Sequence, residues 1–364
     1  MTKRSMGILS TTALLLSLTT AAMAQDLSEV QAPSEPLVLQ SRGSFLVGGE
    51  SVERTPAQLS TIFGPPPAEG GNITVNQMYV DFMVPAEVTG VPVVMLHGAT
   101  LSGKTYDTTP DGRMGWFEYF VRQGHPSYVP DQISRGRSGF DPGIYNDVRA
   151  GIRPPSDLPN VFRQADELNW TQFRIGPSFG QAFNDGQFPI EYADEMSRQA
   201  IPDLNAFLPT PNPNHQAMSD LASDVGGAVL MGHSETGAVP LNAAATDPSD
   251  IAGMILVEPG GCLYTPWTEE DMQTFTQIPI LAVFGDHLDL TTGLGDFSWQ
   301  NAYDSCVQFI DQVNAAGGNA TMLYPPDLGI TGNSHVLMMD SNNLEIADLI
   351  LDWIDDNVEP VSAE

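Results

Sequence analysis

Basic residues are scarce in this chain of 364 residues. Lys and Arg together number 14 against 45 Asp and Glu, which gives a formal net charge of −31 at pH 7. A surface this acidic repels phosphate groups, so the composition argues against nucleic acids and anionic lipids as partners. It also fits a saline environment, in which dissolved ions screen the self-repulsion of the chain.

Cysteine is also scarce, because Cys262 and Cys306 are the only two in the chain. Two cysteines cannot form a zinc cluster alone, and the six histidines show no H-E-x-x-H or other paired spacing. The G-x-G-x-x-G and P-loop patterns that cradle nucleotide phosphates are missing as well. We therefore predict neither a metal site nor an organic cofactor.

Long apolar runs are confined to the amino terminus. Two basic residues precede an apolar run over 6–23, which ends in A-M-A before Gln25. This order predicts a signal peptide over 1–24, cleaved between Ala24 and Gln25, and hence a periplasmic or secreted protein without membrane insertion. The alternative is a retained membrane anchor, but the run is short and rich in Thr, Ser and Ala.

Export makes the two cysteines easier to interpret. An oxidising compartment favours a disulfide bond between Cys262 and Cys306, which lie 44 positions apart. Two unrelated buried thiols remain the alternative.

Residues 25–364 are predicted to form one α/β domain. Predicted strands cover 44–49, 73–85, 91–98, 127–132, 226–232, 251–260, 279–286 and 319–326, and predicted helices cover 116–123, 191–206, 235–245, 298–316 and 343–357. Strands that alternate with helices indicate a doubly wound, mostly parallel sheet with helices on both faces.

Residues 134–222 interrupt this alternation. The stretch is rich in Pro, Gly, Asn and aromatic residues, and it is too long for a simple connection. We predict an insertion that covers the sheet edge and supplies the walls of a pocket. A flexible linker is the alternative, but the density of Phe and Trp argues against it.

The stretch VLMGHSETG, residues 229–237, contains a candidate nucleophile. A serine at a sharp turn between a strand and a helix is exposed for attack, and the usual pattern at such a turn is G-x-S-x-G. Here Ser234 follows Gly232 as expected, but Thr236 occupies the second glycine position and Gly237 comes one place late. The alternative is a serine that only caps the helix.

An activated serine needs a base, and His335 is the best placed of the histidines. It lies between the last predicted strand and the last predicted helix, which is where the base stands in triads whose histidine comes after the serine and the acid in chain order. A solvated loop histidine is the alternative.

The acid that orients this base has two candidates. Glu258 ends the strand predicted after the serine turn and is followed by Pro-Gly-Gly, while Asp286 ends the next strand. Both would face the carboxyl edge of the sheet, where ligands bind. The amides of Glu235 and Ala99 are the predicted oxyanion donors, because one follows the serine and the other follows an HG dipeptide at a buried strand end.

These motifs together resemble the α/β-hydrolase superfamily over about residues 44–357. The stretches that carry the resemblance are MLHGATLSGKTYDTTPDGRMGW, SRGRSG, VLMGHSETG, LVEPGGC, VFGDH and NSHVLMMD. They are most similar to a divergent branch of bacterial esterases, typified by a dimeric, exported enzyme that cleaves esters of halogenated cyclic compounds. Members of that branch carry more disulfide bonding than two cysteines permit.

The resemblance implies a triad of Ser234, Glu258 and His335, with Ala99 and Glu235 as oxyanion donors and Glu258 favoured over Asp286. It also implies a homodimer as a possible assembly. We therefore predict an exported serine hydrolase that cleaves small-molecule carboxylic esters with apolar or cyclic groups through an acyl-enzyme. The alternatives are a polyester depolymerase or lactonase with the same triad, a peptidase or acyltransferase, and a catalytically silent binding protein.

Overall fold

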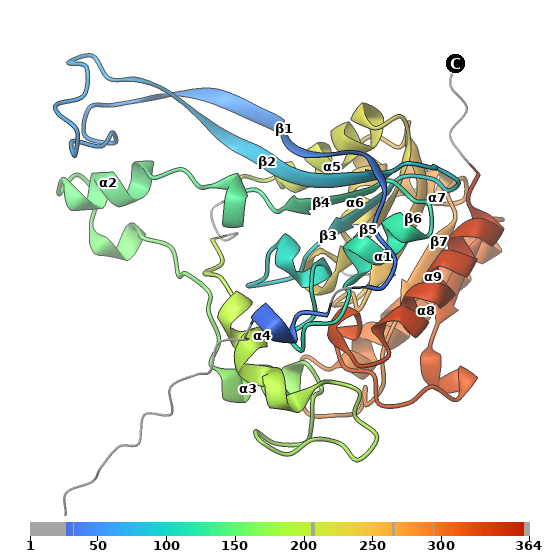
Figure 1. Cartoon of the computed structure of the whole chain (residues 1–364). Coiled ribbons are helices and arrows are strands. Elements are labelled where there is room, and N and C mark those ends of the chain that lie inside the picture. Colours follow the sequence, from blue (N-terminus) through green and yellow to red (C-terminus); the bar gives the residue numbers. More distant parts are fainter. Residues whose placement is uncertain (1–26, 32, 205–207, 264–265, 294, 360–364) are drawn as a thin grey trace, which may run out of the picture.

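An eight-stranded sheet forms the centre of the molecule in this computed structural model (Figure 1). The structure describes residues 27–31, 33–204, 208–263, 266–293 and 295–359, so the predicted signal peptide lies outside it. The strands are β1 (Leu39–Arg54), β2 (Gly71–Pro85), β3 (Val93–Leu96), β4 (Ser127–Asp131), β5 (Ala228–His233), β6 (Ile251–Val257), β7 (Ile280–Val283) and β8 (Ala320–Leu323).

The strand order across the sheet is β1-β2-β4-β3-β5-β6-β7-β8. The first two pairings in this order, β1 with β2 and β2 with β4, are antiparallel. All the others are parallel. The predicted mostly parallel α/β sheet is confirmed.

Helices cover both faces of the sheet. The α-helices of the described residues are α1 (Trp116–Arg122), α2 (Gly143–Arg149), α3 (Asp166–Gln172), α4 (Ala193–Gln199), α5 (Pro213–Asp224), α6 (Val239–Thr246), α7 (Glu269–Phe275), α8 (Trp299–Ala315) and α9 (Asn343–Asn357). The apolar sides of α5, α6, α7 and α8 pack on one face, and those of α1 and α9 pack on the other. No helix in the described ranges is long and apolar enough to cross a bilayer.

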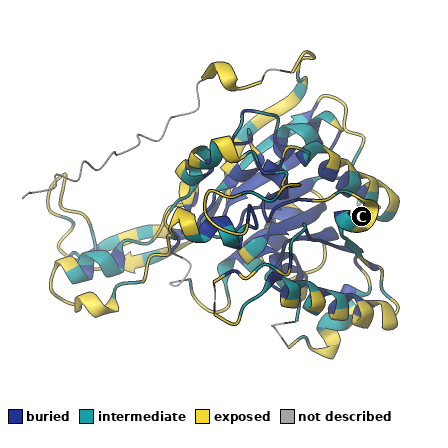
Figure 2. Ribbon diagram, turned by 90° about the horizontal axis from the view of Figure 1, so that it is seen from below, coloured by how far each residue is buried: buried dark blue, intermediate teal, exposed yellow. Residues whose placement is uncertain are grey.

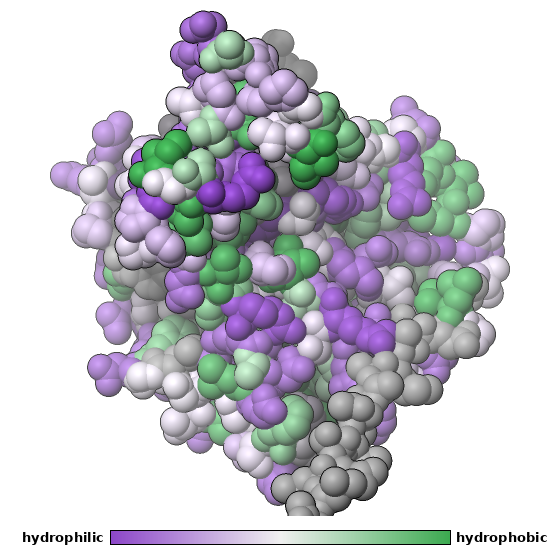
Figure 3. Space-filling model, turned by 90° about the vertical axis from the view of Figure 1, so that its left-hand side faces the viewer, coloured by the Kyte–Doolittle hydropathy of each residue, from purple (hydrophilic) through white to green (hydrophobic). Residues whose placement is uncertain are grey.

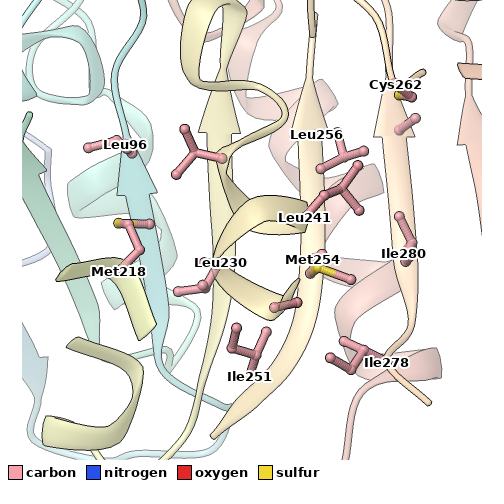
Figure 4. Packing of buried hydrophobic residues seen from close by; sticks show 14 of the residues in the cluster. Leu96, Met218, Leu230, Leu241, Ile251, Met254, Leu256, Cys262, Ile278 and Ile280 are labelled. Carbon is pink, nitrogen blue, oxygen red and sulfur yellow. The ribbon is translucent and has the colours of Figure 1, made fainter. Parts of the chain in front are cut away.

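The alternation of side chains along a strand divides the core into two layers. In β3, Val93 and Met95 belong to one buried cluster, while Val94 and Leu96 belong to the other. Figure 4 shows the second layer, which contains strand side chains such as Leu230 and Leu256 and helix side chains such as Leu241. Figure 2 shows that the central strands are buried, whereas exposed residues lie on the outer helix faces and on the protruding β1–β2 hairpin. Each fully buried aliphatic side chain contributes about 1.5–3 kcal/mol.

The described residues of the stretch over 134–222 include α2, α3, α4 and the start of α5, whereas the sequence predicted one helix, over 191–206. That helix is shorter than predicted and is α4, which directly follows a 3-10 turn over Ile190–Tyr192. The additional helix α5 begins with Pro213 at its first position, and the Asn212 side chain accepts a hydrogen bond from the Asn214 amide. Proline is common at the first position of a helix. Here it lies in a stretch rich in Pro and Asn, which is typical of a loop, so the start of α5 was not predicted.

The hairpin of β1 and β2 extends beyond the rest of the sheet and lies beside α2 (Figure 1). Arg54 at the end of β1 forms a salt bridge with Asp141, just before α2. Ile62 and Phe63 in the hairpin loop are exposed. Figure 3 views this side of the molecule and shows hydrophobic residues in separate clusters among hydrophilic ones.

Candidate active site

The carboxyl ends of β3, β5 and β6 meet at the middle of the sheet. Leu96 of β3 pairs with Gly232 of β5, and His233 pairs with Val257 of β6. The residues that follow these strands therefore emerge side by side. They include Ser234 and Glu258, two of the residues that the sequence singled out.

Ser234 sits in the sharp turn that the motif predicted. Its φ of 59° is a left-handed conformation, which is rare for a residue other than glycine and is typical of an exposed serine between a strand and a helix. The residue opens a 3-10 turn over Ser234–Thr236, and α6 begins only at Val239, later than the predicted helix start. A Cβ on Gly98 would lie 2.8 Å from the Ser234 Cβ, so the glycine lets the two turns approach each other.

Thr236 and Gly237 explain the altered motif. The Thr236 hydroxyl accepts a hydrogen bond from the His233 amide and lies 3.0–3.1 Å from the carbonyl oxygens of Leu96, His97 and His233. It thereby ties the serine turn to the end of β3. A Cβ on Gly237 would lie 2.5 Å from the Pro259 Cα, so the late glycine allows close contact with the turn that carries Glu258.

His335 contacts Ser234 directly. Its Nε2 lies 2.8 Å from the Ser234 Oγ, and its backbone amide donates to the Phe173 carbonyl at 2.8 Å. The ring is buried between the aromatic rings of Phe173 and Trp299, whose centroids lie 5.4 and 4.1 Å away. The His233 ring packs near it too and donates from Nε2 to the His335 carbonyl. These contacts hold the imidazole in one orientation.

Glu258 completes a continuous chain of hydrogen bonds. Its Oε2 accepts from the His335 Nδ1 at 2.9 Å, while its Oε1 accepts from the Gly285 amide and from Arg174 Nη2, the latter at 2.6 Å. Burial alone would raise the pKa of the Glu258 carboxyl. The charge of Arg174 and the hydrogen bond from His335 together outweigh burial and lower this pKa to about 2. The carboxylate is therefore ionised at neutral pH.

His335 remains neutral at neutral pH. Burial lowers the pKa of its imidazole, and the charge of Arg174 lowers it further, while the bond and charge of Glu258 partly raise it. The net direction is below the ordinary histidine value. A neutral imidazole whose Nδ1 donates to Glu258 leaves Nε2 free to accept the proton of the Ser234 hydroxyl.

Arg174 is a residue that sequence reasoning missed. Its side chain is fully buried, its Nε donates to the Asp286 carbonyl at 2.6 Å, and its guanidinium carbon lies 5.2 Å from the centre of the Trp299 ring. It follows α3, within the stretch predicted to be an insertion. No motif distinguishes it, because a buried arginine is recognised only by the carboxylate that it meets in the folded chain.

Asp286, the alternative acid, does not contact His335. Its carboxylate accepts hydrogen bonds from the amides of His287 and Gly332, at 2.6 and 3.0 Å. Asp185, Asp286 and His287 bring possible metal-ligand atoms within 4.8 Å of one another. Asp185 is exposed, and its hydrogen bond to His287 Nε2 accounts for the contact, so we assign no ion to this group.

The remaining histidines have other roles. His97 Nε2 accepts from the Gln132 amide, and burial, helped by Arg135, lowers the pKa of this imidazole to about 4. Burial lowers the pKa of His233 to about 3, so neither ring carries a positive charge at neutral pH. His125 bonds to the Val91 carbonyl, and the partly exposed His215 lies in α5.

A cavity of about 260 Å³ opens onto the Ser234 hydroxyl. Ala99 and Glu235, whose amides the sequence proposed as oxyanion donors, line it together with Ser234 and His335. Among the hydrogen bonds of the described residues, none uses the amide N–H of Ala99 or Glu235. The rest of the lining is largely apolar and aromatic and includes Phe162, Phe173, Phe297 and Trp299.

A disulfide bond joins Cys262 to Cys306, as predicted. Cys262 follows Glu258 by four residues, and Cys306 lies in α8, the helix that begins at Trp299. The bond therefore connects the segment after the carboxylate to the helix that packs on His335.

Known proteins similar to this chain are hydrolases of esters. No family model matches the chain. A solved structure described as that of a novel bacterial esterase is 43% identical, covers 90% of this chain and 99% of its own, and superposes with a TM-score of 0.82. The probable secreted lipase phiG of Fungal sp. (strain ATCC 74256) is 27% identical over 330 residues, which are 78% of this chain and 87% of the lipase.

The extent of the match to the bacterial esterase is sufficient to assign the family. It spans 90% of this chain and 99% of the esterase at 43% identity. The chain belongs to the esterases of the α/β-hydrolase fold and is a carboxylic ester hydrolase.

Proposed function

We propose that the enzyme hydrolyses esters through an acyl-enzyme formed on Ser234. The observation that carries the proposal is the unbroken hydrogen-bonded chain from the Ser234 Oγ through His335 to Glu258, at the wall of the cavity. A helix-capping serine does not require a neutral imidazole held at 2.8 Å from its oxygen.

In the proposed mechanism, Ser234 attacks the acyl carbon of the ester while His335 takes its proton. Glu258 keeps the imidazole in the Nδ1–H tautomer and offsets the positive charge that forms on it. The amides of Ala99 and Glu235 donate to the oxyanion of the tetrahedral intermediate. Collapse of the intermediate expels the alcohol, which receives the proton from His335, and water releases the acid by the same two steps.

We propose further that the preferred esters carry apolar or cyclic groups. The support is the aromatic lining of the cavity by Phe162, Phe173, Phe297 and Trp299. Aromatic walls with few polar groups favour ring-bearing ligands. The predicted insertion supplies two of these residues, so substrate preference belongs to that part of the chain.

Export is part of the same proposal. The amino-terminal pattern of basic, apolar and small residues supports it, and so does the disulfide bond, which forms in oxidising compartments. The name of the fungal lipase describes that protein as secreted. Expression with the native leader, fractionation and amino-terminal sequencing would test it. Cleavage is expected between Ala24 and Gln25, and an intact leader in the cytoplasm would contradict it.

The catalytic proposal is tested with p-nitrophenyl esters of acetate and of cyclohexanecarboxylate, a lactone and an aliphatic polyester. We expect kcat/KM to be higher for the cyclic ester than for acetate. Ser234→Ala should lower kcat by about four orders of magnitude or more. Comparable turnover by the Ser234→Ala variant would refute the nucleophile. Preferred hydrolysis of the lactone or the polyester would transfer the substrate assignment to that class, and no hydrolysis at all would favour a silent binding protein.

A further inference from the structure

A buried guanidinium joins the segments that surround the proposed oxyanion site. Arg135 lies in the loop after β4, and its side chain is fully buried. Its Nη1 donates to the Gly98 carbonyl at 3.2 Å, and its Nη2 donates to Glu235 Oε2 at 2.6 Å. The same Nη2 lies 2.5 Å from Asp203 Oδ2. The Arg135 side chain therefore contacts the turn after β3, the turn after β5, and Asp203 in the segment that follows α4.

The contact with Gly98 acts on the proposed donor itself, because the Gly98 carbonyl and the Ala99 N–H belong to one peptide group. His97 Nδ1 lies 3.0 Å from the same carbonyl oxygen. The Gln132 amide donates to His97 Nε2, which leaves the ring proton on Nδ1 for this bond. Donors at a carbonyl oxygen polarise the peptide, so its N–H becomes a stronger donor.

The contact with Glu235 acts on the second proposed donor. The amide of Glu235 would face the oxyanion, while the carboxylate carbon of the same residue is only three bonds from its Cα. A carboxylate left unpaired there would oppose the charge that develops in the transition state. The guanidinium offsets this charge and restrains the turn that carries the amide.

Asp203 extends the connection to the pocket wall. Its backbone exchanges two hydrogen bonds with Phe162, at 2.9 and 3.0 Å, and Phe162 lines the cavity. Arg135 thus holds the two proposed donor turns against a segment that contacts substrate in the proposed function.

We propose that Arg135 is a positioning residue that fixes and polarises the oxyanion donors Ala99 and Glu235. This inference rests on the proposed function, since it assigns Arg135 to the same site. Arg135 does not touch the reacting atoms, and it acts through the Gly98–Ala99 peptide and the Glu235 side chain. If Arg135 only stabilised the fold, its replacement would change neither kcat nor the affinity for a transition-state analogue in the folded enzyme.

The test compares Arg135→Met and Arg135→Lys with the wild-type enzyme and with Arg54→Lys as the matched control. Arg135→Lys keeps a positive charge against both carboxylates, which preserves folding, but a single ammonium cannot span Gly98 and Glu235 as the guanidinium does. Arg54→Lys makes the same change in the salt bridge with Asp141, at the end of the β1–β2 hairpin and outside the lining of the cavity at Ser234. The readouts are kcat and KM on a p-nitrophenyl ester, the Ki of a boronic acid that forms a tetrahedral serine adduct, and the melting temperature.

We expect the two Arg135 variants to lose kcat by about 10–100-fold with KM nearly unchanged, a smaller loss than removal of an oxyanion donor itself causes. The Ki of the boronic acid should rise by a similar factor, whereas Arg54→Lys should keep kcat within about threefold of wild type. A folded Arg135→Lys or Arg135→Met variant with unchanged kcat, or with unchanged boronate affinity, overturns the inference alone. Turnover that survives Ser234→Ala overturns the proposed function as well.

Discussion

Burial and the charge of Arg174 shift the pKa of the Glu258 carboxyl in opposite directions. A carboxylate this deep in the protein is costly to ionise without a partner, and Arg174 supplies that partner at 2.6 Å. The pair leaves Oε2 for the His335 Nδ1. Arg174 therefore has a direct effect on the proposed base, although it comes from a distant part of the chain.

The two candidate acids make a matched pair of substitutions. Glu258→Gln keeps the size of the side chain but removes the charge that offsets an imidazolium, so we expect kcat to fall by about 10³–10⁴-fold. Asp286→Asn should have a small effect, because that carboxylate bonds to the His287 and Gly332 amides and not to His335. Steady-state kinetics on one ester decide the matter. A larger loss for Asp286→Asn would transfer the role of acid to Asp286.

The pH dependence of Arg174 variants tests the electrostatics. The proposed mechanism needs neutral His335, so kcat/KM rises as pH increases through the pKa of that imidazole. Arg174 lowers this pKa, and Arg174→Met should therefore move the ascending limb of the profile to higher pH. Arg174→Lys keeps a charge at the site and should retain a profile closer to wild type. Superimposable profiles for wild type and Arg174→Met would contradict this account.

The sequence was informative about residues that follow strands and uninformative about their buried partners. Ser234 and His335 could be proposed because each lies at a fixed place in the order of strands and helices. Glu258 and Asp286 both follow strands, so the order of elements left both open as the acid, and only the folded chain shows that Glu258 is the one hydrogen-bonded to His335. Arg174 and Arg135 carry no local signal, since their roles depend on contacts across 84 and 100 positions of the chain.

At the scale of elements, α8 is held close to the proposed site in two ways. Trp299 at its start packs on His335 and donates from its indole nitrogen to the Gln172 carbonyl at 2.7 Å. Cys306, two turns further on, is bonded to Cys262 in the segment after Glu258. Both cysteines are buried in the larger apolar cluster.

Replacement of both cysteines by alanine should destabilise the fold. Without the bond, which closes a loop of 44 positions, the unfolded chain gains conformational entropy. This gain lowers the free energy of unfolding by about 4 kcal/mol. Urea denaturation of the mature protein would measure the loss, with the reduced wild-type protein as the comparison. Equal free energies of unfolding for the variant and the oxidised wild type would show that the bond contributes nothing.

Element boundaries were predictable where the apolar pattern was strong. The run VPVVMLHG predicted a strand buried on both faces, and β3 is fully buried. The helix after Ser234 begins later than predicted, because a 3-10 turn and the close contact of Gly237 with Pro259 precede it. Within 134–222, turn-forming residues obscured α2, α3 and α5, and short helices of seven residues leave little periodicity to read.

At the scale of the whole molecule, a net charge of −31 makes the folded state repel itself. The repulsion is spread over the surface and acts across distances comparable to the Debye length, about 10 Å at 0.1 M salt. Buried pairs such as Arg174 with Glu258 are screened much less. Salt should therefore act mainly on stability and little on the site.

Added NaCl should raise the melting temperature of the mature protein. In chains slightly shorter than this one, each kcal/mol of added stability raises the melting temperature by about 2–4 °C, and we expect a rise of that order here. Scanning calorimetry from low salt to 1 M would measure the rise, and KCl at equal ionic strength should give the same curve. A melting temperature that falls or stays constant over this range would contradict the expectation.

The central claim is that Ser234 is the nucleophile, and covalent labelling tests it most directly. A fluorophosphonate reacts with an activated serine, and peptide mapping by mass spectrometry locates the adduct. We predict a single adduct on the peptide that contains Ser234, abolished in Ser234→Ala and strongly slowed in His335→Ala. An adduct on another residue, or no adduct on an enzyme that still hydrolyses esters, would contradict the account.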